Sequence, residues 1–410
     1  MDNVCNKFVD FFKSGIKSDK KKLIGIEIEH FIVHKDTNES VSYYETNGIR
    51  TILNDLMKYY SDSTPIIDED IIGFHTKEFN ITLEAGGQLE ISINPYEDIE
   101  KIENIYKDFL DNLNSILNKY GYKISFSSCQ PQSHIDNIKM IPKKRYTFME
   151  KYFKKINSNG IHMMKGTCSL QVSIDYFSEN DFRKKIQVAY FLTPFFKLIS
   201  NNSHYYQGTH FDSFLKRTQI YNDTDPKRCG IPPNIFSENY GFRDYAEYLC
   251  NTPMIFYKKD DNYYETDKTF KELFKNKSID NDTLFHMISM VFPDVRLKKY
   301  IEIRGADLIP VKYILGYCTL IKSIFYSEEN LDIFYSMVRE FEVDNNKIKE
   351  IEKNIIKFGW NTKIYGIPFE KFAEKIIELT KKNLNDKDSK YFESIMSIVK
   401  NKGLLNIENK

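Results

Sequence analysis

The 410-residue sequence lacks an excess of charge of either sign, because 58 lysines and arginines are matched by 58 aspartates and glutamates. A nucleic-acid-binding protein that depends on a basic excess along its whole length is therefore not expected. The sequence also lacks close cysteine pairs, since its six cysteines are scattered along the chain. Disulfide scaffolds and zinc ribbons use closely spaced cysteines, so we expect reduced thiols and a cytoplasmic protein.

Long hydrophobic runs are absent as well. The most apolar segment, 186–200, is interrupted by Pro194 and Lys197 and falls short of the roughly 20 apolar residues that cross a bilayer. Residues 1–22 have a lysine-rich end and no apolar centre, so they are predicted to form a helix and a loop rather than a signal peptide. We expect no membrane partner.

Linkers and repeats are missing too, because the composition stays even and no proline-rich, serine-rich or low-complexity stretch occurs. With 41% hydrophobic and 15% aromatic residues, the chain has enough apolar surface for a large core. We therefore predict a single catalytic domain over residues 1–410, with a helical C-terminal section from about residue 327. The sequence does not indicate an oligomeric state.

Four short segments alternate apolar and polar residues with a period of two, which is typical of strands buried on one face. They are residues 24–29, 88–93, 169–175 and 300–304. Because a strand of a doubly wound parallel sheet is apolar on both faces, this alternation favours an antiparallel sheet.

Helical spacing of apolar residues occurs between and after these segments. Residues 102–116 and 369–377 each carry one apolar stripe, and Pro368 is a suitable residue for opening the second helix. Residues 181–199 and 311–326 are more uniformly apolar and are predicted to be deeply buried helices. Strands interspersed with helices in this way predict an α+β fold.

The polar faces of the predicted strands carry carboxylates. Glu27 and Glu29 are two residues apart, so they project from one face, about 6.5–7 Å apart along the strand. Glu84 and Glu90 flank the turn-prone Ala-Gly-Gly sequence at 85–87. Glutamate is also common on the solvated face of a sheet, and for any single pair that is the ordinary interpretation.

The last strand adds Glu302, which lies two residues before Arg304. If the strands are neighbours, five carboxylates and one guanidinium converge on one surface. Carboxylates this close repel one another and need cations, and without histidine or cysteine among them they favour Mg²⁺ or Mn²⁺ over zinc. Metal ions on a carboxylate wall often hold phosphates, and Arg304 would offer a bidentate phosphate donor beside them.

Other catalytic motifs are absent. No Walker A loop, G-x-G-x-x-G or G-x-S-x-G sequence occurs. His30 and His34 are four residues apart, but Phe31 occupies the position of the glutamate in a His-Glu-x-x-His zinc motif, so we interpret both as core or surface histidines. Cys168 has no evident histidine partner and is predicted to be a buried thiol.

Basic side chains form two further clusters. Arg217 and Arg228 border a segment, 221–230, whose Asp, Asn, Pro and Gly residues predict an exposed loop. They could bind a substrate carboxylate or a phosphate, or the segment could be an ordinary solvated turn. Arg145 belongs to a Lys-Lys-Arg-Tyr cluster at 143–146, for which both interpretations remain open.

Together these motifs resemble glutamate–cysteine ligases of the plant and proteobacterial type. The similar stretches occur in the same order as in that family: 24–29 (IGIEIE), 81–90 (ITLEAGGQLE), 163–175 (MMKGTCSLQVSID), 221–232 (YNDTDPKRCGIP) and 296–307 (RLKKYIEIRGAD). The E-x-G-G-Q-x-E and E-x-R-G-A-D strings are specific in combination. With weaker similarity elsewhere, the resemblance spans about residues 8–395.

The resemblance implies a glutamine-synthetase-like fold, in which a curved antiparallel sheet forms a funnel for Mg-ATP, glutamate and an amine. It also implies phosphorylation of the γ-carboxylate of glutamate, followed by attack of the amine of cysteine, as in glutathione biosynthesis. The metal ligands it implies are Glu27, Glu29, Glu84, Glu90 and Glu302. No covalent enzyme nucleophile is required.

The resemblance assigns further roles as expectations. Gln171 would face the metal or the nucleotide, and Arg304 would contact the transferred phosphate. Arg228 would bind the glutamate carboxylate, with Arg217 and Arg145 as further substrate-binding residues.

One position departs from the family. Gly166 replaces an arginine that is common before the Thr-Cys sequence, and Lys165 could supply the missing charge without the fork geometry of a guanidinium. This change leaves the acceptor open, so a γ-glutamyl ligase using a different amine is the main alternative. A non-catalytic nucleotide-sensing homologue and a small-molecule kinase are the others.

Overall fold

A nine-stranded antiparallel sheet forms the centre of the computed structural model, which describes residues 3–259, 262–275 and 277–408. Eight strands follow the order β14-β15-β7-β1-β5-β4-β3-β2, and β6 pairs with the far end of β1. The strands are β1 (Ile24–His34), β2 (Thr64–Ile67), β3 (Ile71–His75), β4 (Phe79–Leu83), β5 (Leu89–Tyr96), β6 (Tyr122–Ser125), β7 (Ser169–Ile174), β14 (Val295–Leu297) and β15 (Ile301–Asp307).

The four strands predicted from alternation are β1, β5, β7 and β15, and they are consecutive neighbours in the sheet. Their register aligns the polar positions: Glu29 lies opposite Glu90, and Glu27 lies opposite Gln171. The apolar partners between them are buried on the other face of the sheet. The predicted α+β fold with an antiparallel sheet is confirmed.

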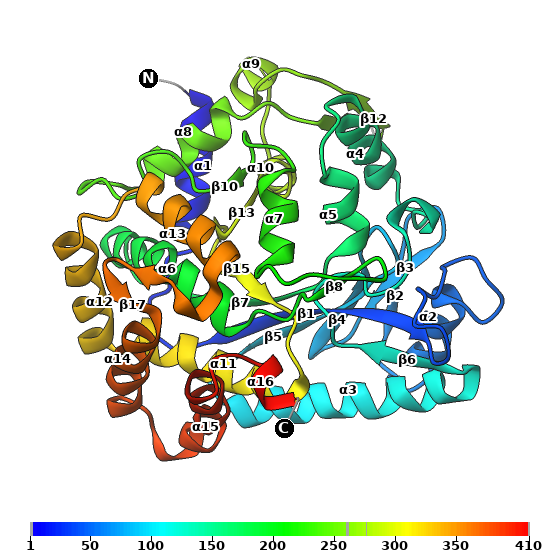
Figure 1. Cartoon of the computed structure of the whole chain (residues 1–410). Helices are drawn as coiled ribbons and strands as arrows, with labels where there is room; N and C mark the ends of the chain where they lie inside the picture. The colour runs from blue at the N-terminus through cyan, green and yellow to red at the C-terminus, as the bar shows by residue number, and fades with distance from the viewer. Residues whose placement is uncertain (1–2, 260–261, 276, 409–410) are drawn as a thin grey trace.

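Two long helices cover the apolar face of the sheet, α3 (Ile99–Tyr120) and α11 (Val311–Tyr326), seen below the strands in Figure 1. Asp98 caps the start of α3 by accepting a hydrogen bond from the Glu100 N–H, and Gly121 ends it in the left-handed conformation. The helices predicted over 102–116 and 311–326 are therefore present. The buried helix predicted over 181–199 is α6 (Glu179–Ile199), which contacts β14 and β15.

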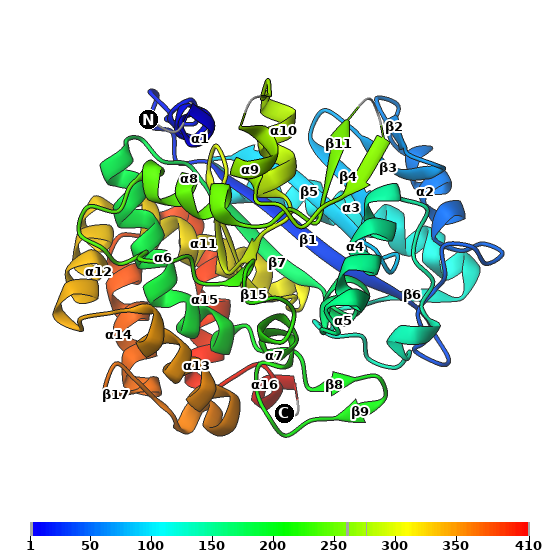
Figure 2. The same cartoon turned by 90° about the horizontal axis from the view of Figure 1, so that it is seen from above.

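Shorter helices lie over the opposite, polar face of the sheet. They are α4 (Lys144–Lys155), α5 (Gly160–Gly166), α7 (Lys216–Asn222) and α10 (Asn281–Ile288), and Figure 2 shows them around β1 when the sheet is viewed from above. The carboxylates therefore lie between the sheet and these helices, not on the outer surface.

The N-terminal segment forms α1 (Asn3–Lys13), followed by irregular backbone as far as β1, in agreement with the predicted helix and loop. Residues 1–2 lie outside the described residues. Among the helices that the structure describes, none combines the length and the apolar composition needed to cross a membrane.

The C-terminal section contains α12 (Glu328–Glu340), α13 (Asn345–Phe358), α14 (Phe369–Lys382) and α15 (Asp386–Lys400). These helices contact α6 and α11 (Figure 1). The buried Lys197 of α6 binds Glu352 of α13 at 2.7 Å and Asp294, which precedes β14, at 2.9 Å. An ion pair therefore connects this section to the sheet, while the single domain over residues 1–410 stays a prediction.

We predict that Lys197→Met lowers the free energy of unfolding by about 3–5 kcal/mol, because it leaves the buried carboxylate of Glu352 and the partly buried carboxylate of Asp294 without their cation. Urea unfolding should be followed by far-UV circular dichroism, which reports the whole chain, and by fluorescence of Trp360, the one tryptophan. Both curves should shift together if the chain is one cooperative unit.

The control is Lys371→Met, which removes the exposed pair with Glu374 and should cost at most about 1 kcal/mol. A Trp360 curve that shifts while the circular dichroism curve does not would show that the C-terminal section unfolds on its own.

Candidate active site

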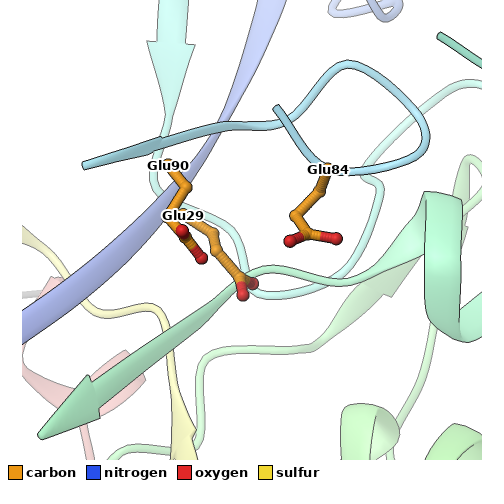
Figure 3. Close-up of side chains that lie close together, drawn as sticks. All are labelled: Glu29, Glu84 and Glu90. Atoms are coloured by element: carbon orange, nitrogen blue, oxygen red, sulfur yellow. The ribbon is translucent and has the colours of Figure 1, made fainter. Parts of the chain in front are cut away.

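Three carboxylates meet on the polar face of the sheet. Glu29 and Glu90 lie opposite each other on β1 and β5, and Glu84 follows the last residue of β4. One oxygen from each can be chosen so that all three lie within 4.8 Å of one another, and Figure 3 shows the side chains turned toward a common space. The predicted convergence of these three residues is confirmed.

The turn between β4 and β5 explains why the E-x-G-G-Q-x-E string requires its glycines. Gly87 has a φ of 87°, in the left-handed region that favours glycine. A Cβ atom on Gly86 would lie 2.9 Å from the carbonyl oxygen of Lys165. The Gln88 amide donates hydrogen bonds to the carbonyl oxygens of Met164 and Thr167, each at 3.1 Å. The turn that carries Glu84 is thereby fixed against the end of α5.

Glu29 is held by two donors from β7. Its carboxylate accepts hydrogen bonds from the Ser169 N–H at 2.7 Å and from the Gln171 amide at 3.0 Å. Burial, reinforced by the nearby charge of Glu84, raises the pKa of Glu29 from 4.5 to about 7.

Glu84 and Glu90 are bonded only to neutral groups. The Tyr146 hydroxyl donates to Glu84 at 3.0 Å, and the Thr82 hydroxyl donates to Glu90 at 2.8 Å. Burial raises the pKa of Glu90 well above its usual value, and the neighbouring glutamates raise it further. Among the described residues, no lysine or arginine forms an ion pair with the three clustered glutamates. Their charge must be neutralised by protons or by a bound cation, and three oxygen donors suit Mg²⁺ or Mn²⁺.

Glu27 lies next to this trio. It shares their face of the sheet, and within the described residues its carboxylate accepts no hydrogen bond. Burial raises its pKa, although the positive charge of Lys298 opposes the increase. The Glu27 carboxylate can therefore accept a hydrogen bond from a ligand or bind a cation.

Glu302 has a different environment from the one predicted. It is fully buried and forms ion pairs with Arg296 at 2.7 Å, Lys298 at 2.6 Å and Arg304 at 2.9 Å. Burial alone would raise its pKa, but the three cations outweigh burial and lower the pKa well below its usual range. Glu302 is not part of the trio, so the predicted set of five metal-binding carboxylates is not assembled in this structure. Glu302 is instead the counter-ion of the cluster formed by Arg296, Lys298 and Arg304.

Arg304 and Gln171 both line the candidate site, as the sequence predicted. The Arg304 guanidinium donates to the Gln171 side-chain oxygen and to Glu302. Arg304 lies in a bulge of β15, where one extra residue falls between Ile303 and Ala306 relative to β7. Its side chain is thereby fixed beside the carboxylates.

Arg217 supports this bulge and does not line the site. It is buried, and its guanidinium donates to the carbonyl oxygens of Arg304 at 3.1 Å and Gly305 at 3.5 Å. The structure therefore does not place Arg217 where the expected direct contact with a substrate could form.

The space around these groups is a cavity of about 360 Å³, which we call the carboxylate cavity. Lys143 and Arg145, at the start of α4, line its opposite side. Arg145 donates to the hydroxyl of Ser289 at 3.3 Å, and its Nε has no partner among the described residues. Burial lowers the pKa of Lys143, although the charge of Glu84 opposes the decrease. The predicted Arg145 therefore reaches the cavity.

Several lining residues were not among the predicted site residues, although Lys143 and Tyr146 belong to the 143–146 cluster whose role was left open. They are Thr82, Lys143, Tyr146, Tyr221, Phe285, Ser289, Arg296 and Lys298. Arg296 and Lys298 have the same even spacing as Glu302 and Arg304, so alternation extended toward the N-terminus was the signal for them.

Two predicted substrate-binding residues lie elsewhere. Arg228 is fully buried and donates to Asp225, to the Tyr152 hydroxyl and to the carbonyl oxygens of Met290 and Pro253. The prediction of an exposed loop is wrong at Arg228, because its ion pair with Asp225 holds the guanidinium in the interior.

Lys165 is also turned away from the cavity. Its ammonium group donates to the carbonyl oxygen of Ile138 at 2.8 Å. A Cβ atom on Gly166 would meet Ile135 at 2.7 Å, so this position also faces away from the carboxylates. Lys165 therefore does not supply a charge to the cavity in place of the missing arginine.

The residues set aside from the sequence are structural. His30 is buried on the opposite face of β1, where its ring nitrogens contact the Leu89 carbonyl oxygen and the Tyr106 hydroxyl. Burial lowers its pKa to about 4, so it is neutral at pH 7. Cys168 is a buried thiol, as predicted.

Comparison with known proteins gives consistent matches. A family model described as "Glutamate-cysteine ligase family 2(GCS2)" matches residues 23–363. The chloroplastic glutamate–cysteine ligase A of Oryza sativa subsp. japonica is 29% identical over 385 residues, which are 92% of this chain and 77% of that protein. The chloroplastic glutamate–cysteine ligase of Medicago truncatula is 28% identical over 404 residues, 96% of this chain and 78% of that protein.

A solved structure has a similar fold. The glutamate–cysteine ligase of Francisella tularensis, crystallised in complex with AMP, superimposes with a TM-score of 0.52 at 13% sequence identity. The match covers 93% of this chain and 81% of that chain. The predicted glutamine-synthetase-like α+β fold is confirmed.

We predict that the metal-free protein loses stability as the pH rises from about 4.5 through 7. The pKa of Glu29 is higher in the folded state than the ordinary 4.5, so its proton stabilises the fold at low pH and that contribution is lost as it dissociates. Mg²⁺ should compete with this proton, so its apparent affinity should rise about tenfold per pH unit below pH 7. Urea unfolding of the metal-free protein at several pH values measures the first effect, and calorimetric titration with Mg²⁺ at the same pH values measures the second.

A control for general pH effects is Glu29→Gln, which cannot ionise and should bind Mg²⁺ weakly with a flatter pH dependence. The prediction would be contradicted if the Mg²⁺ affinity of the unmodified protein did not change between pH 5.5 and 7, because Mg²⁺ would then not compete with the Glu29 proton.

We predict that Glu302→Ala destabilises the fold by about 3–5 kcal/mol, since it leaves three buried cations without their anion. Chemical unfolding measures the loss, and Glu378→Ala, at an exposed position of α14, should change stability by less than about 0.5 kcal/mol. A loss of activity with unchanged stability would instead place Glu302 in direct contact with a ligand.

Proposed function

The chain belongs to glutamate–cysteine ligase family 2, and from this membership we propose that it joins L-glutamate to L-cysteine with consumption of ATP. The product would be γ-glutamylcysteine, formed through a γ-glutamyl phosphate. The observation that carries the proposal is that clustered, unneutralised carboxylates and a cluster of guanidinium and ammonium groups line the same cavity. Phosphoryl transfer needs both, because charge on the phosphates and on the transferred group must be neutralised.

The clustered carboxylates would hold the metal ions. Glu29, Glu84 and Glu90, with Glu27 beside them, offer oxygen donors that no side-chain cation occupies. Bound Mg²⁺, or Mn²⁺ with the same donors, would supply neutralisation of the phosphate charge. The Francisella ligase crystallised with AMP supports an adenine nucleotide as the co-substrate.

Arg304 would bind the transferred phosphate. Its guanidinium lies at the cavity wall, and Glu302 and Gln171 hold it there before any ligand arrives. This preorganisation means that little reorganisation is needed as charge develops on the phosphate oxygens. Glu302 thus acts through Arg304 as a positioning residue.

Lys143 and Arg145 would bind the carboxylates of the amino-acid substrates. They lie across the cavity from β1, and neither forms an ion pair with a carboxylate among the described residues. The acyl phosphate would then be attacked by the amine within the same cavity, between the sheet and the helices that lie over it.

A different amine acceptor is the second candidate, and the departure at position 166 favours it. Gly166 and Lys165 do not direct charge toward the carboxylate cavity, so one binding group common in the family is missing. The carboxylate cluster speaks against a non-catalytic homologue, since three closely spaced, mutually repelling acids would be retained at a cost to stability.

We predict that the protein, ATP, Mg²⁺, glutamate and cysteine together release phosphate and give a product with the mass of γ-glutamylcysteine. Omission of glutamate, cysteine or Mg²⁺ should each abolish the product. A panel of other amines, followed by the same mass measurement, tests the second candidate. Phosphate release with another amine and none with cysteine would establish the second candidate in place of the first.

Glu90→Gln should lower kcat at least 100-fold, because it removes one of three clustered metal-binding carboxylates. The matched control is Glu350→Gln at an exposed position of α13, which should leave kcat unchanged. Full activity in Glu90→Gln would remove this residue from the metal site.

A further inference from the structure

Both backbone polar groups of Arg304 are hydrogen-bonded in the bulge of β15. Its carbonyl oxygen accepts from Arg217 at 3.1 Å, and its N–H donates to the carbonyl oxygen of Asp294 at 2.8 Å. Asp294 directly precedes β14, so this second bond continues the β14–β15 ladder by one position. The place of the Asp294 carbonyl oxygen therefore helps to determine where the Arg304 side chain begins.

The backbone around Asp294 gives this carbonyl oxygen little other support. The Asp294 N–H donates to the Gly230 carbonyl oxygen at 3.3 Å, which is longer than the usual range for such a bond. The preceding residue is Pro293, which has no N–H to donate. The Asp294 carboxylate, in contrast, pairs with Lys197 at 2.9 Å. This ion pair is therefore the firmer attachment of the residue that binds the Arg304 N–H.

Lys197 lies beside the bulge itself. It belongs to α6, which contacts both β14 and β15 (Figure 1), and its side chain is only 3% exposed. A Cβ atom on Gly305 would lie 3.6 Å from both Cγ and Cε of Lys197, so the lysine stem runs alongside the residue that follows Arg304. The ammonium group at the end of this stem reaches Asp294.

The two ion pairs of Lys197 connect it to different parts of the molecule. The pair with Glu352 at 2.7 Å joins α6 to α13, whereas the pair with Asp294 is directed at the backbone that binds Arg304. Replacing a buried ion pair by apolar side chains of similar size is often neutral or stabilising, so stability alone does not explain a charge at Asp294. Fixing the direction of a residue is a different role.

We propose that Asp294 is a positioning residue for Arg304. Its ion pair with Lys197 holds the carbonyl oxygen that binds the Arg304 N–H, and thereby keeps the guanidinium directed into the carboxylate cavity. Neither Asp294 nor Lys197 is among the described residues that line this cavity, so both act through Arg304. The inference rests on the proposed function, because it takes Arg304 to bind the transferred phosphate.

Two leucine variants separate positioning from stability. Asp294→Leu and Glu352→Leu each leave Lys197 with one carboxylate, so both should lower the urea midpoint of unfolding. Only Asp294→Leu should lower kcat, by about 10- to 100-fold, since a displacement of about 1 Å at a group that contacts the reacting atoms can cost 100-fold. The KM values for glutamate and ATP should stay unchanged in both variants, because the loss is confined to the transition state.

The conservative variant is Asp294→Asn. Its side-chain oxygen has the same reach as the carboxylate and can still accept a hydrogen bond from Lys197, so it should retain most of kcat. Asp294→Ser is a milder alternative to the leucine variant. Its shorter polar side chain does not reach Lys197, and we expect the same loss of kcat with less loss of stability.

Calorimetric titration with Mg-ADP and glutamate, with and without aluminium fluoride, gives a readout that does not depend on turnover. Aluminium fluoride bound beside ADP mimics a phosphate during transfer, whereas Mg-ADP alone places no group there. Asp294→Leu should weaken binding of the fluoride complex about tenfold or more, and leave binding of Mg-ADP unchanged. Glu352→Leu should change neither.

Equal loss of kcat in the two leucine variants would overturn the inference, and so would reduced stability in Asp294→Leu with an unchanged kcat. A loss in Asp294→Asn as large as in Asp294→Leu would also overturn it. The proposed function fails separately: no product from the unmodified protein with any amine would refute it, while selective loss of fluoride-complex binding in Asp294→Leu would still support the positioning role. Product formation with identical behaviour of the two leucine variants would do the reverse.

Discussion

Repulsion between buried carboxylates on one face of an antiparallel sheet is the constraint on which the rest of the site depends. Alternation places Glu27 and Glu29 on the same side of β1, and the register places Glu90 opposite Glu29. The protein provides neutral hydrogen-bond donors to this group and directs its nearest cations to Glu302 instead. Charge is thus separated within a few residues of one sheet: the anions remain open to a ligand, and the cations are held by one internal anion.

This separation connects the fold to the chemistry expected of the family. A fully compensated cluster would be more stable but would have little affinity for a divalent ion, because side-chain ammonium groups would already neutralise it. Burial, together with the neighbouring glutamates, raises the pKa values of Glu29 and Glu90, and a cation bound from outside the chain would oppose this increase.

The sequence was most informative where the pattern is local. Period-two alternation is a property of a single strand, so it predicted the faces of β1, β5, β7 and β15 and the α+β class correctly. It failed for Glu302, whose neutralisation depends on Arg296, its partner across the β14–β15 pair. It also failed for Arg228, because turn-forming residues around an arginine do not reveal that Asp225 draws it into the interior. Lys143 reaches the carboxylate cavity only through the packing of α4 over the sheet, which spacing alone does not encode.

The bulge in β15 has a mechanical consequence. The extra residue frees the carbonyl oxygens of Arg304 and Gly305 from the ladder with β7, and Arg217 of α7 takes them up. The helix α7, which lies over the sheet, is thereby attached to β15 at Arg304, the residue whose guanidinium faces the cavity. Any tilt of α7 would be transmitted through these hydrogen bonds to Arg304, so α7 and the part of β15 that carries Arg304 would move together.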